Sequence, residues 1–305
     1  MDLSARVGPV AFPNPVMTAS GTSGHGAELG AYFELAELGA VVVKSLAAEP
    51  WPGNAPPRLV PVESGMLNSV GLQGPGVEAW IESELPALVA AGARVVASIW
   101  GTTIDAYAKA AEMLATAPDS VVAVEVNVSC PNIEDRRRMF AHSPTATAEA
   151  MAATAPCNRP RWAKLSPNVT DVTEIAGAAL SAGAGALTLV NTVMGMAVDT
   201  DGRRPALGAG GGGLSGPAIR PVAVRAVYEC REAFPDAAIV GVGGVTRGQD
   251  VAELMLAGAD AVQVGTATFA DPRAPRRVLE EFVAWCRRHG VARSSELTGA
   301  AHERR

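Results

Sequence analysis

One pattern recurs along the chain: a helical run ends in glycine, and a short β-branched run then leads to a polar residue. In one example Gly39 is followed by Ala40, three consecutive valines and Lys44. Glycine often ends helices in the left-handed conformation, and an apolar run without alternation indicates a strand buried on both faces. We therefore expect helix-to-strand joints over residues 38–44, 91–98, 182–191 and 257–266.

Four further apolar runs complete the expected set of strands, and they cover residues 16–20, 121–128, 161–165 and 238–242. Eight strand-helix units without a dividing linker favour a single TIM-type (β/α)8 barrel, an α/β fold, over a doubly wound sheet with a second domain. The whole chain, 1–305, is then one domain. We expect residues 290–305 to form a flexible tail.

Two long insertions interrupt the repeat of strands and helices. Residues 46–79 are rich in Pro and Gly, and residues 196–217 contain four consecutive glycines. Loops of this length in a compact domain are usually lids or binding surfaces, so we expect both at the active-site face. A solvated linker is the alternative, and it suits the glycine run better than residues 65–72.

Composition narrows the function classes. The chain is 48% hydrophobic and 18% charged, as in globular proteins, and its net charge of -6 offers no basic surface for nucleic acid or anionic lipid. The segment from Met1 to Pro15 has no secretory pattern, and no apolar run is long enough to span a membrane. We predict a cytoplasmic protein that binds neither nucleic acid nor membrane.

Cysteine and lysine usage points to particular residues. No C-x-x-C pair is present, so we expect no metal or iron–sulfur site in this chain. Arginine provides all the basic residues except Lys44, Lys109 and Lys164. Because lysine is a compact charge that fits tight sites, Lys44 and Lys164 are candidate site residues. Lys109 lies in a helical run over residues 105–117 and is expected at the surface.

Barrel enzymes build their sites where the strands end. Here these positions carry amides, hydroxyls and ammonium groups and few carboxylates or histidines, which favours a planar, hydrogen-bonding ligand over a metal. The residues are Ser20, Lys44, Ser45, Ser98, Asn127 to Asn132, Lys164, Asn191, Thr192, Gly243, Gly244, Gly265 and Thr266.

The glycines after the last two expected strands, 243–244 and 265, predict a phosphate site. Barrels bind phosphate at this place through backbone N–H groups, helped by a helix N-terminus. The alternative is that glycine only relieves crowding at the rim. No G-x-G-x-x-G motif follows the first strand, so a nicotinamide nucleotide is not the expected ligand.

Cys130 directly follows the fourth expected strand. A thiol can serve as a proton acceptor once its surroundings lower its pKa, and a loop position gives it access to ligand. The alternative is a small buried hydrophobic residue, an interpretation that suits Cys157, Cys230 and Cys286. Asn127 and Asn132 lie five positions apart and could face one ligand.

These motifs together resemble class 1 dihydroorotate dehydrogenases, over residues 14–271. In combination, in order and at strand ends, they are highly specific. The loop 68–72 and residues 191–196 look most like the catalytic subunit of subclass B. The matching segments are 14–22, 44–45, 68–73, 127–132, 191–192 and 213–217.

The resemblance implies oxidation of dihydroorotate to orotate in pyrimidine biosynthesis. It implies FMN in this chain, a homodimer, and a second subunit with FAD and a 2Fe–2S cluster that passes electrons to NAD within a heterotetramer. This chain contains neither the cluster cysteines nor the second nucleotide-binding fold of such a subunit. The terminal electron acceptor therefore stays undecided: it is NAD through a partner, fumarate or another oxidant.

The resemblance also implies residue roles. Cys130 would remove the C5 proton of dihydroorotate while the C6 hydride goes to FMN, with Lys44 between flavin and substrate. The substrate would be held by Lys44, Asn68, Ser69, Val70, Gly71, Leu72, Asn127, Asn191 and Thr192. FMN would be held by Ser20, Lys44, Ser45, Ser98, Asn127, Lys164, Val190, Gly216, Gly243, Gly244, Gly265 and Thr266, with Lys164 stabilising the reduced flavin.

Two positions and one segment depart from the family pattern. Ser98 and Gly74 stand where the family usually has Asn, and residues 133–140 are unusually charged. With Ser98 in place of Asn, the resemblance implies that one flavin hydrogen bond is shorter or bridged by water. For the charged run, a solvated face is the default interpretation.

Other functions remain open at this stage. A Schiff-base aldolase or lyase would use Lys164 and need no flavin. A related FMN barrel would act on another dihydropyrimidine, and a non-catalytic flavin-binding subunit would be inert with every acceptor supplied.

Overall fold

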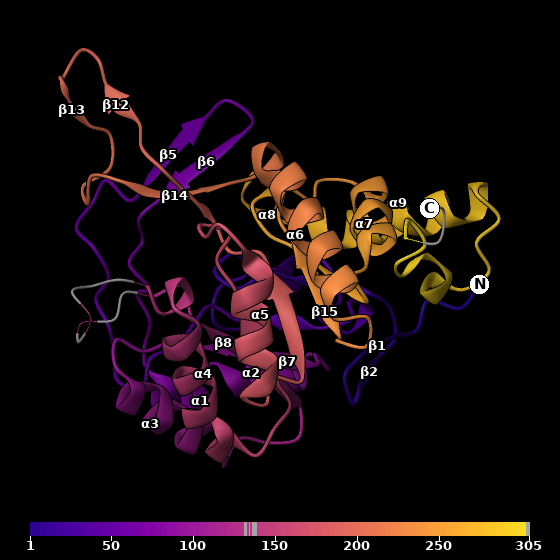
Figure 1. The fold of residues 1–305 in the computed structure, drawn as a ribbon, viewed down its shortest axis with the longest axis horizontal. Helices are drawn as coiled ribbons and strands as arrows, with labels where there is room; N and C mark the ends of the chain where they lie inside the picture. The colour runs from indigo at the N-terminus through magenta and orange to yellow at the C-terminus, as the bar shows by residue number, and fades with distance from the viewer. Residues whose placement is uncertain (131–132, 134, 136–138, 303–305) are drawn as a thin grey trace.

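The computed structural model describes residues 1–130, 133, 135 and 139–302, and its centre is a parallel sheet in the order β3-β16-β15-β10-β9-β8-β7-β4. A bridge between Met17 and Ala40 joins the two edge strands, with the Thr18 amide 3.2 Å from the Ala40 carbonyl oxygen. The predicted (β/α)8 barrel is confirmed (Figure 1). Its strands are β3 (Val16–Thr18), β4 (Val41–Val42), β7 (Val95–Ile99), β8 (Val121–Asn127), β9 (Arg161–Lys164), β10 (Ala186–Leu189), β15 (Ile239–Val242) and β16 (Ala261–Val264).

Helices cover the outside of the barrel. Thr103 and Asp171 cap two of them by accepting backbone N–H bonds, which satisfies donors that a helix start leaves free. The helices are α1 (Val77–Ser83), α2 (Leu85–Ala90), α3 (Ile104–Leu114), α4 (Pro144–Ala153), α5 (Val172–Ser181), α6 (Arg220–Ala233), α7 (Gly248–Ala257), α8 (Ala267–Ala270) and α9 (Ala274–Arg288). No helix in the described ranges is long and apolar enough to cross a membrane.

The predicted joints, in which a helix ends at glycine and a strand follows, are confirmed with one exception. Gly92 and Gly183 adopt φ of +67° and +90°, the left-handed conformation expected after a helix. The first joint differs, because two short 3-10 helices, η1 (Glu28–Ala31) and η2 (Leu35–Glu37), precede β4. Gly39 is needed there for close approach, since a Cβ would lie 2.5 Å from the Asn14 carbonyl oxygen.

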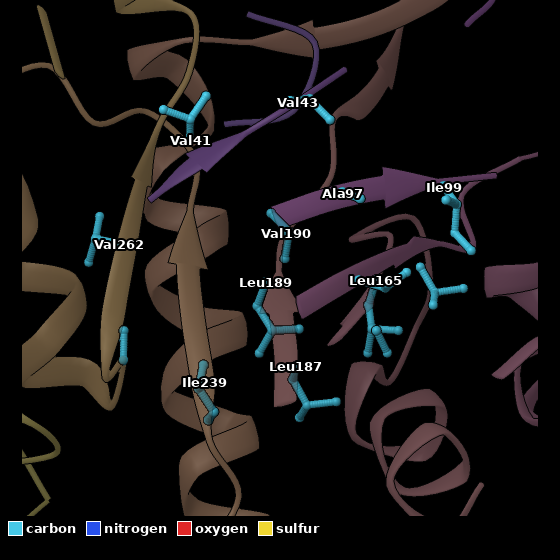
Figure 2. Close-up of a cluster of buried hydrophobic side chains, with 14 of the residues drawn as sticks. Val41, Val43, Ala97, Ile99, Leu165, Leu187, Leu189, Val190, Ile239 and Val262 are labelled. Carbon is cyan, nitrogen blue, oxygen red and sulfur yellow. The ribbon is translucent and has the colours of Figure 1, made fainter. Parts of the chain in front are cut away.

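The strands bury side chains on both faces, as their uninterrupted apolar runs predict. Outward-facing residues such as Leu187, Leu189 and Ile239 belong to the large cluster that packs under the helices (Figure 2). A second, separate cluster fills the barrel interior with at least one residue from or beside each strand, among them Val96, Ala123, Trp162, Ala186, Val240 and Ala261. The hairpin of β1 (Ala5–Val7) and β2 (Val10–Phe12) adds Phe12 and closes the bottom.

The two insertions contain short strands, and strands from the two insertions pair with each other. The antiparallel sheet β11-β14-β6-β5 joins them through the Asn68–Gly213 register, and a separate hairpin projects away (Figure 1). A Cβ at Gly212 would lie 2.4 Å from the Asn68 carbonyl oxygen, so the glycine run permits close strand contact and is not a solvated linker. These strands are β5 (Leu59–Val62), β6 (Gly65–Asn68), β11 (Val193–Gly195), β12 (Val198–Asp199), β13 (Arg204–Pro205) and β14 (Gly212–Ser215).

The C-terminal residues up to 302 contact the barrel. Ser294 donates to the Ser4 carbonyl oxygen at 3.1 Å, and the ring of His302 stacks on that of Tyr228. Leu297, in η6 (Ser294–Leu297), is buried. The part of the expected tail that the structure describes is therefore packed, and it lies on the same side of the molecule as the N-terminus (Figure 1).

Candidate active site

A cavity of about 390 Å³ opens at the C-terminal ends of the barrel strands, under the sheet made by the two insertions. This size is typical of sites for small ligands. Nearly all the residues expected to bind substrate or cofactor line it: Ser20, Lys44, Ser45, Asn68, Ser69, Val70, Gly71, Leu72, Asn127, Lys164, Val190, Asn191, Thr192, Gly216, Gly243, Gly244, Gly265 and Thr266.

Ser98 is expected to contact the ligand, but it lies one layer deeper. Its side chain is fully buried and is not among the lining residues. The Ser98 Oγ lies 2.8 Å from the Ser45 Oγ, which also accepts the Asn127 amide at 3.3 Å. Ser98 therefore reaches the cavity through Ser45, because a serine is too short to do so directly.

Asn127 is the centre of a hydrogen-bonded group at the cavity wall. Its Oδ1 accepts the Asn191 side-chain amide at 3.0 Å and the backbone N–H of Ser129 at 3.1 Å. With both acceptor and donor atoms engaged, the orientation of the amide is fixed. The group thereby presents a defined set of donors and acceptors to a ligand.

Cys130 does not face the cavity in this conformation. The thiol is fully buried, and its Sγ lies 3.4 Å from the Asn127 carbonyl oxygen, near Tyr107. Burial raises the pKa of Cys130 to about 12 and outweighs the opposing effect of the nearby Tyr107 hydroxyl. The expectation that the loop position gives this thiol access to ligand is therefore wrong for this conformation, because the side chain turns into the packed region beside Phe140 and Tyr107.

The segment after Cys130 lies mostly outside the described residues. This applies to the prediction for Asn132 and to most of the charged run 133–140. Its closing end is described: Phe140 donates its N–H to the Cys130 carbonyl oxygen at 3.2 Å, and its ring packs edge-on against Tyr107. The base of the loop is therefore anchored to α3.

Lys44 lies at the cavity with its charge partly desolvated. Burial lowers its pKa, and the nearby Arg58 guanidinium lowers it further. His25 lies behind it, and its pKa is lowered by burial and then by Lys44. A Cβ at Gly74 would meet the His25 Nε2 at 3.1 Å, so the departure from Asn at position 74 leaves room for the imidazole.

The loop 68–72 is held by two residues that the sequence analysis did not single out. Asn54 donates its side-chain amide to the Ser69 carbonyl oxygen at 3.0 Å and its backbone N–H to the Val70 carbonyl oxygen at 3.0 Å. Arg58 donates to the Asn54 carbonyl oxygen at 2.5 Å and to Gln73. No motif marks either residue, and only their contacts reveal this role.

Lys164 extends from the end of β9 and lines the cavity while contacting a buried carboxylate. Its Nζ lies 3.4 Å from Oε1 of Glu125, whose other oxygen accepts the Gln263 amide at 2.8 Å. Glu125 lies inside an apolar run and was not predicted as a site residue. The inward two-residue periodicity that places Asn127 at the cavity could have identified it.

The glycines at the other side of the cavity form a cradle of backbone. Gly243 and Gly244 have φ of +138° and +73°, and a Cβ on Gly244 would lie 2.5 Å from the Arg220 Cβ. Within the described part of the chain, the amides of Gly243, Gly244 and Gly265 donate no hydrogen bond to other residues. Free N–H groups on bare backbone suit a phosphate.

The helix contribution expected at this phosphate site is not available from α7. Asp250 already accepts the Thr246 and Arg247 amides at its N-terminus, at 2.7 and 3.0 Å. Crowding also accounts for part of the glycine usage, as the Arg220 contact shows. The crowding interpretation therefore holds for Gly244, and phosphate binding at these glycines stays a prediction.

Asn168 is another cavity residue that was not predicted. It donates to the Thr192 carbonyl oxygen at 3.0 Å and accepts the Met194 amide at 2.8 Å, which fixes the segment after β10. Elsewhere the simpler expectations hold. Lys109 is exposed and paired with Glu49, while Cys157, Cys230 and Cys286 are buried.

Comparison with known proteins agrees with this geometry. The family model described as "Dihydroorotate dehydrogenase" matches residues 2–285. The chain is 44% identical over 300 residues to the catalytic subunit of dihydroorotate dehydrogenase B (NAD(+)) of Geotalea uraniireducens (strain Rf4). It is 43% identical over 300 residues to the protein of the same name of Geobacter sulfurreducens (strain ATCC 51573 / DSM 12127 / PCA). Each alignment covers 98% of both chains.

Proposed function

The chain belongs to the dihydroorotate dehydrogenase family, and from this premise we propose that it oxidises dihydroorotate to orotate in pyrimidine biosynthesis with a bound FMN. The observation that carries the proposal is the cavity itself. One wall offers fixed amides, and the opposite wall offers backbone N–H groups that have no partner in the described part of the chain. Two lysines, Lys44 and Lys164, contribute positive charge. This set suits a pyrimidine ring stacked on a phosphate-bearing planar cofactor.

The residues of the cavity fit FMN. Gly243, Gly244 and Gly265 would hold its phosphate through amides that have no partner within the described residues, with Gly216 and Thr266 beside them. Ser20, Ser45, Asn127, Lys164 and Val190 would hold the ring system, with Ser98 acting through Ser45. When bound, FMN supplies a two-electron acceptor for the hydride at C6 of dihydroorotate.

Dihydroorotate would bind between Lys44 and the loop 68–72. Its carboxylate suits the Lys44 ammonium and the backbone of the loop, which Asn54 and Arg58 hold in place. Its ring carries both donors and acceptors, which suit the side chains of Asn68, Asn127 and Asn191 with Thr192. Fixed amides orient the ring without taking part in proton transfer.

Cys130 is the proposed base. As a thiolate, its Sγ would take the proton from C5 of dihydroorotate. At the buried position beside Tyr107 the pKa is raised to about 12, which keeps the thiol protonated. The role therefore requires the side chain to turn to the cavity side of the strand end, where Ser129 and Asn127 already lie.

The relatives' name, catalytic subunit of a B-type NAD(+) enzyme, supports a partner for electron transfer. We propose a second subunit carrying FAD and a 2Fe–2S cluster that delivers electrons to NAD, and a homodimer of this chain within a heterotetramer. Copurification from the native host tests this directly. Recovery of the chain without an iron–sulfur flavoprotein would contradict it.

A Schiff-base aldolase is the less favoured function. That chemistry needs an uncharged amine, whereas the Lys164 Nζ lies 3.4 Å from the buried Glu125 carboxylate. A pure protein without a flavin absorption band, and without one after reconstitution, would overturn the FMN proposal. An FMN protein reduced by dihydrouracil and not by dihydroorotate would reassign the substrate.

Anaerobic mixing with dihydroorotate tests the role of Cys130. We expect Cys130→Ala to bind FMN and orotate normally and to lose flavin reduction by roughly 10²- to 10⁴-fold, the usual contribution of a general base. Cys157→Ala, which removes another buried thiol, is the matched control and should reduce its flavin at the wild-type rate. Reduction of Cys130→Ala at that rate would refute the assignment.

A further inference from the structure

Along five strands of the barrel, the inward-facing side chain is apolar at one position and polar two residues later. The lower layer is the apolar cluster that includes Ala123, Trp162 and Ala261. Two positions further on, where side chains point to the same face, the residues are polar and buried. These residues are Ser98, Glu125, Lys164, Thr188 and Gln263.

Glu125 carries the negative charge of this layer. Its side chain is fully buried, and each carboxylate oxygen faces one donor: Lys164 Nζ at 3.4 Å and Gln263 Nε2 at 2.8 Å. Removing a carboxylate from water is costly, and a buried ion pair is often no more stable than apolar packing. The layer is also incompletely satisfied, because Gln263 Oε1 and Thr188 Oγ1 have no hydrogen-bond partner among the described residues. Stability alone therefore does not explain the pair.

Lys164 connects this layer to the cavity. It lines the cavity, its side chain is only 6% exposed, and Glu125 provides the one ion pair that it makes within the described ranges. Charges in such a dry environment are weakly screened, so the carboxylate affects whatever the ammonium faces. The ammonium and the carboxylate act on the cavity as a unit.

We propose that Glu125 is a positioning residue that holds the Lys164 ammonium at the cofactor and, through its own charge, limits how strongly reduced flavin is stabilised. The inference rests on the proposed function, because it assumes that FMN occupies the cavity. A positive charge favours the anionic reduced flavin over the oxidised form. The Glu125 carboxylate offsets part of that charge and keeps the bound flavin a better reductant.

Glu125→Gln tests the charge while preserving the shape. The new amide can still accept from Lys164, and a rotated Gln263 amide can offer its unpartnered Oε1 to the new NH₂ group. We expect the ratio of FMN affinities, reduced over oxidised, to rise at least tenfold. For a two-electron couple this equals about 30 mV in the midpoint potential. Sulfite, which adds to oxidised flavin as an anion, should bind more tightly in parallel.

Thr188→Val is the matched control, since it changes the same layer without changing charge. For this variant, the ratio of FMN affinities, reduced over oxidised, and the sulfite affinity should each stay within twofold of the wild-type values. An unchanged or lowered ratio in Glu125→Gln, with a folded, flavin-loaded protein, would overturn the inference. A wild-type protein that binds no FMN would instead overturn the proposed function.

A second test compares Lys164→Met with the double variant, so it does not require the single variant Glu125→Gln to fold. Lys164→Met leaves the carboxylate unbalanced and should lower the affinity ratio at least tenfold. Adding Glu125→Gln to Lys164→Met restores neutrality and should bring the ratio back up at least tenfold. Equal potentials in the single Lys164→Met and double variants would show that Glu125 has no electrostatic effect on the flavin.

Discussion

The Cys130 Sγ and the Tyr107 hydroxyl converge on one acceptor, the Asn127 carbonyl oxygen, at 3.4 and 2.7 Å. This shared contact ties the proposed base to the helix behind it and to the amide residue in front of it. Burial raises the pKa of Tyr107 well above its usual value and that of Cys130 to about 12. Both groups are therefore protonated at neutral pH in this arrangement.

Alkylation measures this protection. With a pKa near 12 in place of about 8.5, the thiolate fraction of Cys130 at pH 8 is about a thousandfold smaller. We expect iodoacetamide to modify Cys130 at least a thousandfold more slowly than glutathione, with a rate that keeps rising with pH above 8.5. Peptide mass spectrometry resolves the four cysteines, and denatured protein is the control. A rate within tenfold of glutathione would place the thiol in a different environment.

The pair Ser45 and Ser98 gives a prediction for stability. Ser45→Ala leaves the buried Ser98 hydroxyl without its side-chain partner and should lower the free energy of unfolding by about 1–3 kcal/mol. Ser98→Ala removes the buried hydroxyl itself and leaves Ser45 with Ser20 and Asn127, so about 0.5–1.5 kcal/mol is expected. Urea unfolding should show that the double variant costs less than the sum. Additive losses would mean that the two hydroxyls do not interact.

The sequence predicted the barrel and most of its cavity because both follow from local pattern. Apolar runs after glycine joints mark strands buried on both faces, and the residue after each run must lie at the same end of a parallel barrel. Lys44, Asn127, Lys164 and Asn191 were placed correctly by this rule alone.

Tertiary contacts decided the rest. The glycine-rich strand β14 has almost no intrinsic β preference and forms because bare backbone can pack against β6. The Cys130 side chain is buried against the Asn127 carbonyl oxygen and does not line the cavity, and no sequence pattern encodes that contact. Asn54 and Arg58 act through hydrogen bonds inside a folded loop that no motif marks. The periodicity of its strand places Glu125 inside the barrel, but its pairing with Gln263, 138 positions away, appears only once the strands are assembled.

Gly244→Ala tests the backbone cradle. The left-handed φ of +73° costs an alanine about 1–2 kcal/mol, and its Cβ would also meet Arg220 at 2.5 Å, which must displace the backbone. We expect FMN affinity to fall at least tenfold, measured by ultrafiltration and flavin fluorescence. Gly290→Ala is the matched control, with φ of +69° and open space around the Cβ. It should lose stability only, and equal FMN affinity in both variants would argue against phosphate binding at Gly244.

Lys44 predicts a pH dependence of ligand binding. Burial, and secondarily Arg58, lower its pKa below the ordinary 10.5, so the ammonium loses its proton at a lower pH than a free lysine. The charged form binds the orotate carboxylate. Affinity should therefore be full below the lowered pKa and fall up to tenfold per pH unit above it, with proton uptake on binding in that range. Flavin absorbance changes on adding orotate give the dissociation constant from pH 7 to 10.

Lys44→Arg isolates this effect, because a guanidinium stays charged across the range. The variant should bind orotate more weakly at every pH, since a planar guanidinium does not replace a compact ammonium. The part of the pH dependence of the dissociation constant that comes from Lys44 should, however, be absent. Any proton that orotate itself loses in this pH range affects wild type and Lys44→Arg equally, so it does not contribute to the difference between their pH profiles. Parallel pH profiles would show that Lys44 does not carry the ligand's charge, and the carboxylate would then be held by the backbone of the loop 68–72 alone.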